Sequence, residues 1–598
     1  MLACSRALPG PPESAEPAES AWPPADAASG ISDPNVADLL RRHWATELEL
    51  YPMLATVLGV HRFDDRVDDN SPEGIAKGRA ATRAFLTEAQ VLAARSDLPH
   101  GDRRSLELLQ ERLAASIASE VCAFEEWSLS VSDNALSRWN RLPEDQKVTT
   151  PASGDTLVAR YALIAEHIDR EVANLRRGLA RGLVSNAETT RRVADMFEKQ
   201  LAQPLADWPL LAPTRVSHDD WPAATLGRFR AALRATVSDQ IRPAFERYAA
   251  FLKTEGLPRA RRDDQSGVAF LPNGAACYRA RVRAHTTLER DPRALHQLGL
   301  DQIAALDREL AELGQSALGT TSLAQTLERL RSDPALYFRS AEEIEGAARS
   351  ALARARAAQP RAFGVLPKAD CVVARVPDYE AAYTAIGYYR APNPDGTKPG
   401  ELFVNVSKPE TRPRFEAAAL AFHESIPGHH LQIAISQELG ALPAFRKHAG
   451  FTAFVEGWAL YTERLADELG LYADALDRLG MLSFDAWRAS RLVVDTGVHA
   501  LGWSRQRAIA FMLKHTALTP KNIDNEVDRY IAWPGQALAY KTGQLEILAL
   551  RELAQARLGP RFDLRAFHDA VLLGGGVSLP VLRQQVNAYI DGVSAVRD

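Results

Sequence analysis

The sequence has few cysteines and no long uninterrupted hydrophobic run. Its 598 residues include four cysteines, Cys4, Cys122, Cys277 and Cys371, which are far apart and form no C-x-x-C pair. A disulfide framework or a thiolate zinc site is therefore not expected, and we predict isolated buried or free thiols. No apolar run approaches the ~20 residues that a membrane helix needs. The sequence thus predicts no integral membrane segment.

The chain also lacks a large excess of charge of either sign. It has 71 Lys and Arg against 76 Asp and Glu, a formal net charge of −5. Nucleic-acid-binding proteins usually carry a basic excess, so this balance argues against a nucleic-acid partner. Hydrophobic residues make up 46% of the chain, which is enough apolar surface for large cores and excludes disorder as the main state. Oligomeric state stays open.

The first 30 residues are rich in Pro, Ala, Ser and Glu and contain no apolar segment like that of a signal peptide. We interpret residues 1–30 as a disordered leader, with ordered sequence from about Asp33. Two locations stay open. As written the chain is cytoplasmic, but Leu2-Ala3-Cys4-Ser5 looks like the end of a bacterial lipoprotein signal. With a start further upstream, the protein would be exported and lipid-anchored at Cys4.

Hydrophobic spacing predicts a mainly α fold with a small β-sheet. Helices are predicted over 36–54, 74–95, 103–126, 157–179, 187–201, 225–252, 292–313 and 340–358, and again from 413 onward. Breaks are expected at Pro- and Gly-containing segments such as 151–154.

Strands are predicted at two places in the middle of the chain. Residues 370–377 alternate and are rich in Val, and residues 401–406 follow a turn rich in Pro and Gly. We therefore expect a small sheet at about 365–408. It would lie within a catalytic region, 261–598, which follows a helical N-terminal region, 31–260. Whether these regions are separate domains stays open.

The segment A-A-L-A-F-H-E-S-I-P-G-H-H-L-Q contains three imidazoles and a carboxylate within eight residues, in a chain with 14 His. In the zincin motif H-E-x-x-H, two His on one helix face bind zinc and the Glu polarises a water. Here His423 and His429 are six residues apart, which does not fit an unbroken helix. Pro427 cannot donate to the carbonyl four residues back, so we predict that the helix bulges or breaks there. That change would return His429 to the metal-facing side.

A third ligand candidate is Glu456, which interrupts the apolar run F-T-A-F-V-E-G-W-A-L-Y. A carboxylate there is costly to bury unless it is paired or binds a metal. Glu463, seven residues later on nearly the same face, is a candidate to support the ligands from behind. The alternatives are a polar helix kink for the histidines and an ordinary buried ion pair for Glu456.

These motifs resemble the bacterial family called domain of unknown function 885, in the zincin-like metallopeptidase clan. His423, Glu424, Pro427, Gly428 and His429 match its H-E-x-x-P-G-H pattern, and Glu456 begins its E-G-W-A-x-Y element. The likeness runs from about residue 35 to the C-terminus.

The resemblance implies a gluzincin-type helical fold that encloses a deep cleft. It also implies one Zn²⁺ held by His423, His429 and Glu456, with Glu424 as general base. His429 is preferred over His430, which we expect to line the pocket. A member of the family that has lost its metal or activity stays an alternative.

Two C-terminal segments offer groups that could stabilise an oxyanion. Tyr540, after the turn Trp533-Pro534-Gly535-Gln536, is the first candidate, and His499 is the second. Arg491, Asp495 and His499 are spaced by four, as on one helix face. The alternatives are a core tyrosine and a solvated face of i,i+4 ion pairs.

Four further side chains are candidates for substrate binding: Asn405, His430, Arg491 and Lys541. Asn405 belongs to the strand 401–406, which we expect to be an edge strand that aligns a peptide by β-addition. A plain structural strand is the alternative.

The sequence therefore predicts a zinc metallopeptidase of short peptides. Two other classes stay open: a metal-dependent hydrolase of a non-peptide amide, and a non-catalytic anchored binding protein with a degenerate site.

Overall fold

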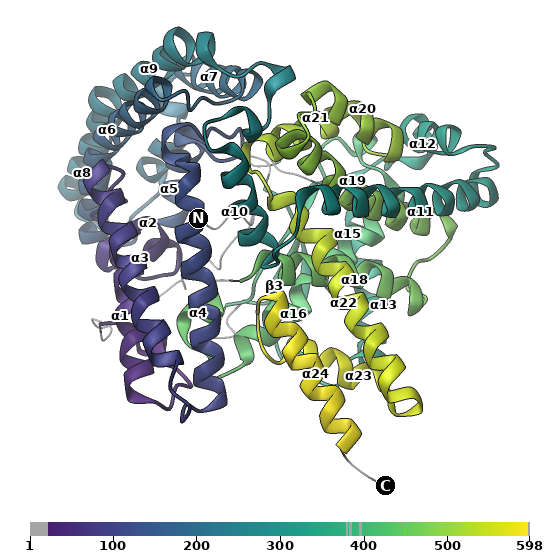
Figure 1. The fold of residues 1–598 in the computed structure, drawn as a ribbon. Helices are drawn as coiled ribbons and strands as arrows, with labels where there is room; N and C mark the ends of the chain where they lie inside the picture. The colour runs from purple at the N-terminus through teal and green to yellow at the C-terminus, as the bar shows by residue number, and fades with distance from the viewer. Residues whose placement is uncertain (1–21, 378–380, 382–385, 394–397, 449, 596–598) are drawn as a thin grey trace.

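The protein is mainly helical, with a small three-stranded sheet, as predicted (Figure 1). The structure is a computed structural model and describes residues 22–377, 381, 386–393, 398–448 and 450–595. The α-helices are α1 (Pro34–Leu50), α2 (Pro52–Val57), α3 (Pro72–Ala93), α4 (His100–Ser119), α5 (Ala135–Asp145), α6 (Pro151–Ala180), α7 (Ala187–Leu201), α8 (Ala223–Thr236), α9 (Arg242–Phe251), α10 (Gly274–Thr286), α11 (Pro292–Leu318), α12 (Leu323–Ser332), α13 (Ala341–Ala362), α15 (Ala417–Glu424), α16 (His429–Glu438), α17 (Ala444–His448), α18 (Thr452–Glu468), α19 (Ala475–Ala500), α20 (Arg505–His515), α21 (Pro520–Ala532), α22 (Ala539–Leu558), α23 (Leu564–Leu572) and α24 (Leu579–Ala595).

Capping residues explain where several helices begin. Asn186 accepts from the backbone of Glu188 and Thr189, and α7 has the predicted bounds. Residues 151–154, predicted as a break, are instead the first turn of α6. Thr150 and Ser153 form a capping box there, and proline is well suited to the first helical position.

The sheet contains strands β1 (Cys371–Arg375), β2 (Gly387–Arg390) and β3 (Gly400–Val404) in the order β1-β3-β2. β3 pairs in parallel with β1 and antiparallel with β2. The two predicted strands are confirmed, and β2 was missed. The prediction that the 401–406 strand offers a free edge is wrong, because β3 is the central strand and its backbone pairs on both sides.

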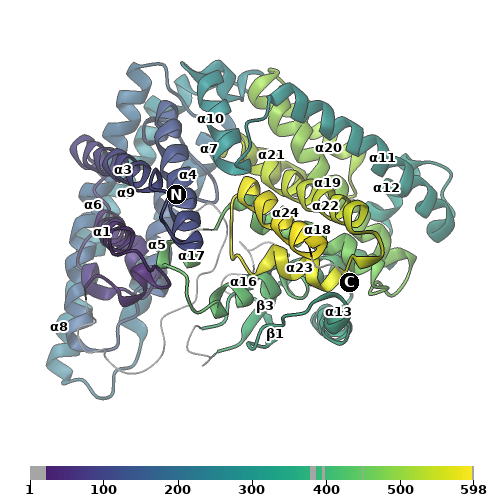
Figure 2. The ribbon, with the colours of Figure 1, turned by 60° about the horizontal axis from the view of Figure 1, so that its bottom comes forward.

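Two hydrophobic cores divide the N-terminal region. Residues of α5 to α9, with segments between them, form a core of their own, and we call residues 129–252 the α5–α9 lobe. Figures 1 and 2 show α1, α3 and α4 on the same side of the molecule as α6 and α8. Their buried residues nevertheless belong to one core with those of α18, α22 and α24. The N-terminal region is therefore partly continuous with the C-terminal one.

A disulfide joins Cys122, just after α4, to Cys277 on α10. The prediction of isolated thiols is wrong for this pair, because folding brings together two cysteines that are 155 residues apart. The bond ties the chain just before the lobe to the chain just after it. Cys371 is a buried free thiol, as predicted, and Cys4 lies outside the described residues.

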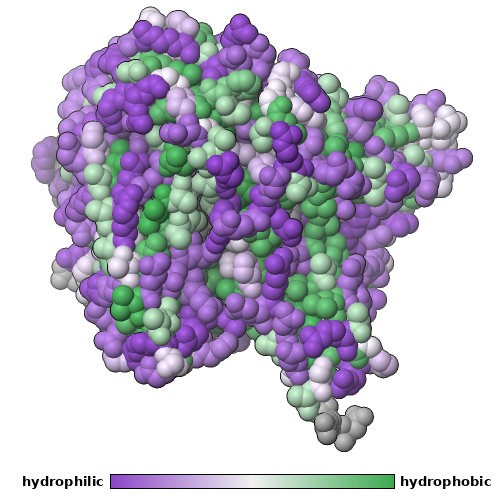
Figure 3. All heavy atoms as spheres, viewed as in Figure 1, coloured by the Kyte–Doolittle hydropathy of each residue, from purple (hydrophilic) through white to green (hydrophobic). Residues whose placement is uncertain are grey.

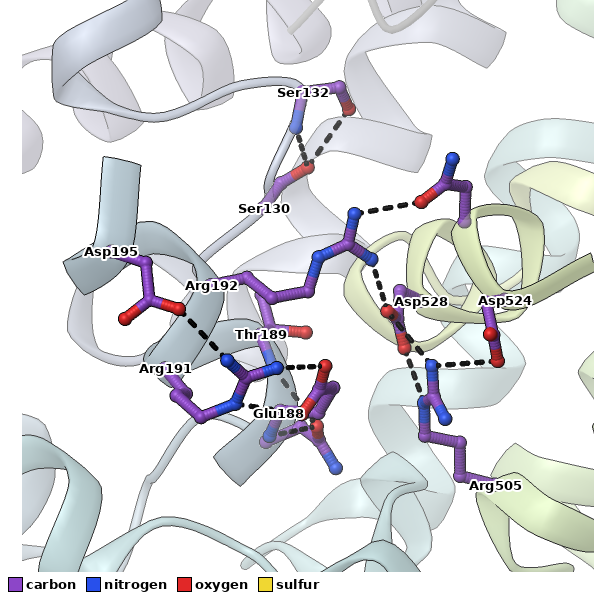
Figure 4. A network of polar contacts seen from close by, with 12 residues as sticks. Ser130, Ser132, Glu188, Thr189, Arg191, Arg192, Asp195, Arg505, Asp524 and Asp528 are labelled. Carbon is purple, nitrogen blue, oxygen red and sulfur yellow. Dashed lines mark hydrogen bonds and ion pairs between the residues drawn. The ribbon is translucent and has the colours of Figure 1, made fainter. Parts of the chain in front are cut away.

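The lobe also contacts the C-terminal region through charged side chains (Figure 4). Arg192 on α7 donates to Asp528 at 2.5 Å and to Asn525 at 2.7 Å, both on α21. Asp528 accepts a second hydrogen bond from Arg505 on α20. Hydrophilic side chains cover much of the face shown in Figure 3, with hydrophobic ones in smaller patches.

Local structure is already present before Asp33, where ordered sequence was expected to begin. Trp22 packs edge-on against Phe63 at 5.2 Å, and Ala27 is buried within a short 3-10 helix. Residues 1–21 of the predicted leader lie outside the described residues. Among the described helices, none combines the length and apolar character needed to cross a bilayer.

Candidate metal centre

The helix breaks where Pro427 predicts it. α15 ends at Glu424 and α16 begins at His429, with Gly428 donating its N–H to the carbonyl of Phe422 at 3.0 Å. A Cβ on Gly428 would lie 2.0 Å from the carbonyl oxygen of His423, so only glycine fits this close return of the chain.

His423, His429 and Glu456 converge in one place. The Nε2 atoms of His423 and His429 lie 3.7 and 3.6 Å from Oε2 of Glu456, and the three ligand atoms all lie within 4.8 Å of one another. Tetrahedral zinc with ligand bonds of about 2.0–2.1 Å requires ligand atoms about 3.4 Å apart. The group therefore has the donor types and spacing of a metal site. The deep cleft expected around it stays a prediction.

Glycine packing brings α18 and α22 together at the site. A Cβ on Gly457 would lie 2.4 Å from the Cα of Gly543, so the backbones of the two helices are in direct contact where they cross. The indole of Trp458 donates to the carbonyl of Pro427 at 3.0 Å. Glu456 is thereby fixed, from a different helix, against the segment that carries the two histidines.

Glu463 supports the centre from behind. It accepts a hydrogen bond from Nδ1 of His423 at 2.8 Å, which directs Nε2 toward Glu456. Glu463 is 1% exposed and lies 3.9 Å from the guanidinium of Arg488 on α19. The suggested supporting role of Glu463 matches this geometry.

The carboxylates control protonation at the site. Burial lowers the pKa of His423, but the carboxylates of Glu456 and Glu463 outweigh this and raise its pKa to about 9. Burial favours protonated Glu456, yet its hydrogen bonds to His423 and His429 hold its pKa well below the usual range. A metal ion that binds here must displace a proton from His423, so the affinity of the site for a metal is expected to rise with pH.

Glu424 is the last residue of α15, partly exposed and next to His423. Its negative charge contributes to the raised pKa of His423.

His430 points away from the group formed by the other three residues. It is fully buried, donates from Nε2 to the carbonyl of Ala369 at 3.1 Å, and accepts at Nδ1 from the Tyr389 hydroxyl at 3.0 Å. Burial lowers its pKa to about 4. The ligand geometry therefore favours His429.

Tyr540 and Arg491 lie together. The guanidinium of Arg491 is 4.1 Å from the centre of the Tyr540 ring, and both residues are buried. Arg491 also donates to Glu526 at 2.9 Å and to the hydroxyl of Tyr530 at 3.0 Å.

His499 and Asp495 face backbone and side-chain partners inside the protein. The N–H of Val268 donates to Nδ1 of His499, and Nε2 donates to the carbonyl of Tyr530. Asp495 accepts from the Tyr278 hydroxyl and from the N–H of Gly535. Since both ring nitrogens of His499 are occupied, it has no N–H to offer a substrate. The face shared with Arg491 is buried, which excludes a solvated ion-pair face.

Lys541 and Asn405 also have internal partners. Lys541 is 3% exposed and forms an ion pair with Asp485 at 2.5 Å. Asn405 is 1% exposed, donates to the carbonyl of Ala381 at 2.8 Å, and accepts from the N–H of Ser407 at 3.1 Å.

Arg488 and Asp485 were missed by the sequence reasoning. Both are buried on α19, and they contact Glu463 and Lys541, respectively. A signal was present: from residue 485 to residue 499, α19 carries a charged residue or histidine every three or four positions among mostly apolar ones. Such spacing in a buried helix indicates internal ion pairs.

A protein-family profile matches most of the chain. The profile of a family described as bacterial protein of unknown function (DUF885) matches residues 52–586. No curated protein matches the chain.

Solved structures are also similar. A Colwellia psychrerythraea protein, provisionally described as a lipoprotein, has a TM-score of 0.86 and 26% identity over 93% of this chain and 99% of its own. A Shewanella oneidensis protein of unknown function, with the same provisional description, has a TM-score of 0.70 and 20% identity, covering 92% and 99%. An M32 carboxypeptidase from Deinococcus radiodurans R1 reaches 0.39 and 11%, covering 94% and 98%.

Proposed function

The chain belongs to the DUF885 family, and from this premise and its site we propose that it is a zinc-dependent peptidase acting on short peptides. The observation that carries the proposal is the convergence of two imidazole Nε2 atoms and one carboxylate, with Glu424 beside them. Two His and one Glu are the donor set of catalytic zinc sites that keep a position open for water.

Each residue has a defined role in this proposal. His423, His429 and Glu456 hold the metal, which when bound supplies a Lewis acid for polarising water and carbonyl. Glu424 accepts the proton of the attacking water and passes it to the leaving amine. Tyr540 donates a hydrogen bond to the oxyanion as the tetrahedral intermediate forms.

The other candidates have separate roles. Arg491 binds substrate, while His499, Lys541, His430 and Asn405 keep surrounding elements in place through the internal contacts described above.

The first experiment measures metal content and peptide hydrolysis together. Wild type is expected to hold about one zinc per chain, and His423→Ala and Glu456→Ala to hold none. Glu424→Gln should retain zinc but lose about 10²–10⁴-fold in turnover of a short-peptide library. Full activity of Glu424→Gln contradicts the mechanism. A wild type that binds no zinc contradicts the proposal altogether, and turnover of non-peptide amides alone contradicts the substrate class.

We also propose that the protein acts outside the cytoplasm. The Cys122–Cys277 disulfide supports this, because such bonds persist in oxidising compartments, and the relative at 26% identity is provisionally described as a lipoprotein. Thiol alkylation of protein taken directly from producing cells should leave both cysteines unmodified until a reductant is added. Alkylation of both without reductant contradicts export.

A further inference from the structure

Arg491 presents a buried donor that the protein does not use. Its Nε and Nη2 atoms donate to Tyr530 and Glu526, but Nη1 is buried and has no acceptor in the described part of the chain. The residue is 3% exposed. A buried guanidinium N–H without a partner is costly unless a ligand completes it.

The packing of α15 against α19 shows how far along α15 the position of Arg491 lies. Gly480 on α19 contacts Phe415, just before α15, and Arg488 reaches His423 through Glu463. Both pairs of positions are eight residues apart along their chains. The helices therefore run side by side in the same direction, and Arg491, one turn beyond Arg488, lies level with the C-terminal end of α15.

Neighbouring groups hold the Arg491 guanidinium rigidly. It stacks on the rings of Trp487 at 4.6 Å and Tyr540 at 4.1 Å. A guanidinium fixed in this way suits a carboxylate, because a hydrogen bond from Nη1 to a carboxylate oxygen is strengthened by the opposite charges.

The local charge also favours an anion. Arg529 lies beside Arg491, and both guanidinium groups share the single carboxylate of Glu526. This leaves one positive charge of the trio uncompensated next to Tyr540.

We propose that Arg491 binds a carboxylate of the substrate, supplied either by the free C-terminus of the peptide or by an acidic side chain. This inference rests on the proposed peptidase function and specifies its substrate class.

The test compares three matched peptides: one with a free C-terminus, its C-terminal amide, and an amidated peptide with a Glu side chain. We expect kcat/KM of wild type to be at least about tenfold higher for one of the carboxylate peptides than for the plain amide. Preference for the free acid identifies the terminus, and preference for the Glu peptide identifies the side chain. Equal rates for all three overturn the inference.

Variants assign the preference to Arg491. Arg491→Gln should bring the carboxylate-to-amide ratio close to one, and Arg491→Lys, which keeps a charge opposite Glu526, should retain part of it. The exposed Arg507, stacked on Trp503, provides the control Arg507→Gln, which should keep the wild-type ratio. A ratio unchanged in both Arg491 variants overturns the assignment.

A binding measurement separates this inference from the proposed function. Calorimetry with zinc-loaded Glu424→Gln protein and the same three peptides should show tighter binding of a carboxylate peptide, again lost in Arg491→Gln. If wild type cleaves no peptide but this preference is present, the peptidase proposal fails and the carboxylate site stands. Equal binding of all three peptides overturns the site.

Discussion

The α5–α9 lobe and the helices around the candidate metal centre differ in where most of their charged pairs lie. In the lobe, pairs such as Arg170–Glu166 and Arg247–Asp169 lie at the surface, with side chains 39–62% exposed. On α19, Asp485, Arg488, Arg491, Asp495 and His499 are all at most 5% exposed. An amphipathic helix turns its charges to water, whereas α19 is covered on nearly every side and must pair them with other helices.

This difference shows that ion pairs of the same residue types contribute differently to stability at the surface and in the interior. Exposed pairs contribute little to stability, so the lobe depends on its apolar core. Burying the charged pairs around α19 costs desolvation energy. Once both residues of a pair are buried, removing either one leaves the other as an uncompensated charge.

The largest expected effect comes from breaking one buried pair. Asp485→Asn leaves the ammonium of Lys541 buried without its ion partner, and should lower the free energy of unfolding by about 3–5 kcal/mol. Asp169→Asn, at the exposed pair with Arg247, should cost at most about 1 kcal/mol. Urea unfolding followed by tryptophan fluorescence measures both. Equal losses of unfolding free energy in the two variants would show that burial of the ion pair does not determine its contribution to stability.

A smaller effect is expected behind the metal ligands. Glu463→Gln keeps the shape but weakens the acceptor for His423 Nδ1, and should reduce metal affinity about 10- to 100-fold. The control is Glu468→Gln on the same helix, where Glu468 pairs with Arg551 at the surface and no change is expected. Competition with a zinc chelator measures the affinity. Unchanged zinc affinity in Glu463→Gln would show that the hydrogen bond between Glu463 and His423 does not contribute to metal binding.

The smallest effect tests whether burial, rather than region, controls titration. Burial lowers the pKa of His499 on α19 and of His167 in the lobe to about 3. Below pH 6.5, the ordinary pKa of histidine, each of these side chains binds a proton in the unfolded chain but not in the folded protein. The free energy of unfolding therefore falls as the pH drops toward about 3.

His499→Gln and His167→Gln should therefore each reduce the stability lost between pH 7 and 5, by up to about 2 kcal/mol. Thermal or urea unfolding at the two pH values measures the difference. If one variant alone changes the pH dependence, burial is not the deciding factor.

Much of the fold was predictable because local rules act where helices face water. α7 has a clear apolar stripe and an Asn cap, and its predicted bounds are those observed. The missed β2 is a four-residue strand whose existence depends on pairing with β3, which no local pattern of its own encodes. The same reason explains the error over the central position of β3.

The candidate metal ligands were recognisable because their chemistry is unusual in the sequence. Three imidazoles beside Pro427, and a carboxylate in the apolar run around Glu456, cannot be explained by packing alone. The partners of those residues were less predictable. Arg488 becomes relevant only because α19 packs against both α15 and α18.

By itself, the sequence determined the helical class and the break at Pro427, since each follows from neighbouring residues and backbone geometry. Its resemblance to a family pointed to the candidate ligands His423, His429 and Glu456. Tertiary structure alone decided the Cys122–Cys277 bond, the internal partners of His499 and Lys541, and the unused donor of Arg491. The physical reason is that the burial and the partners of a side chain depend on which helix, distant in the sequence, packs against it.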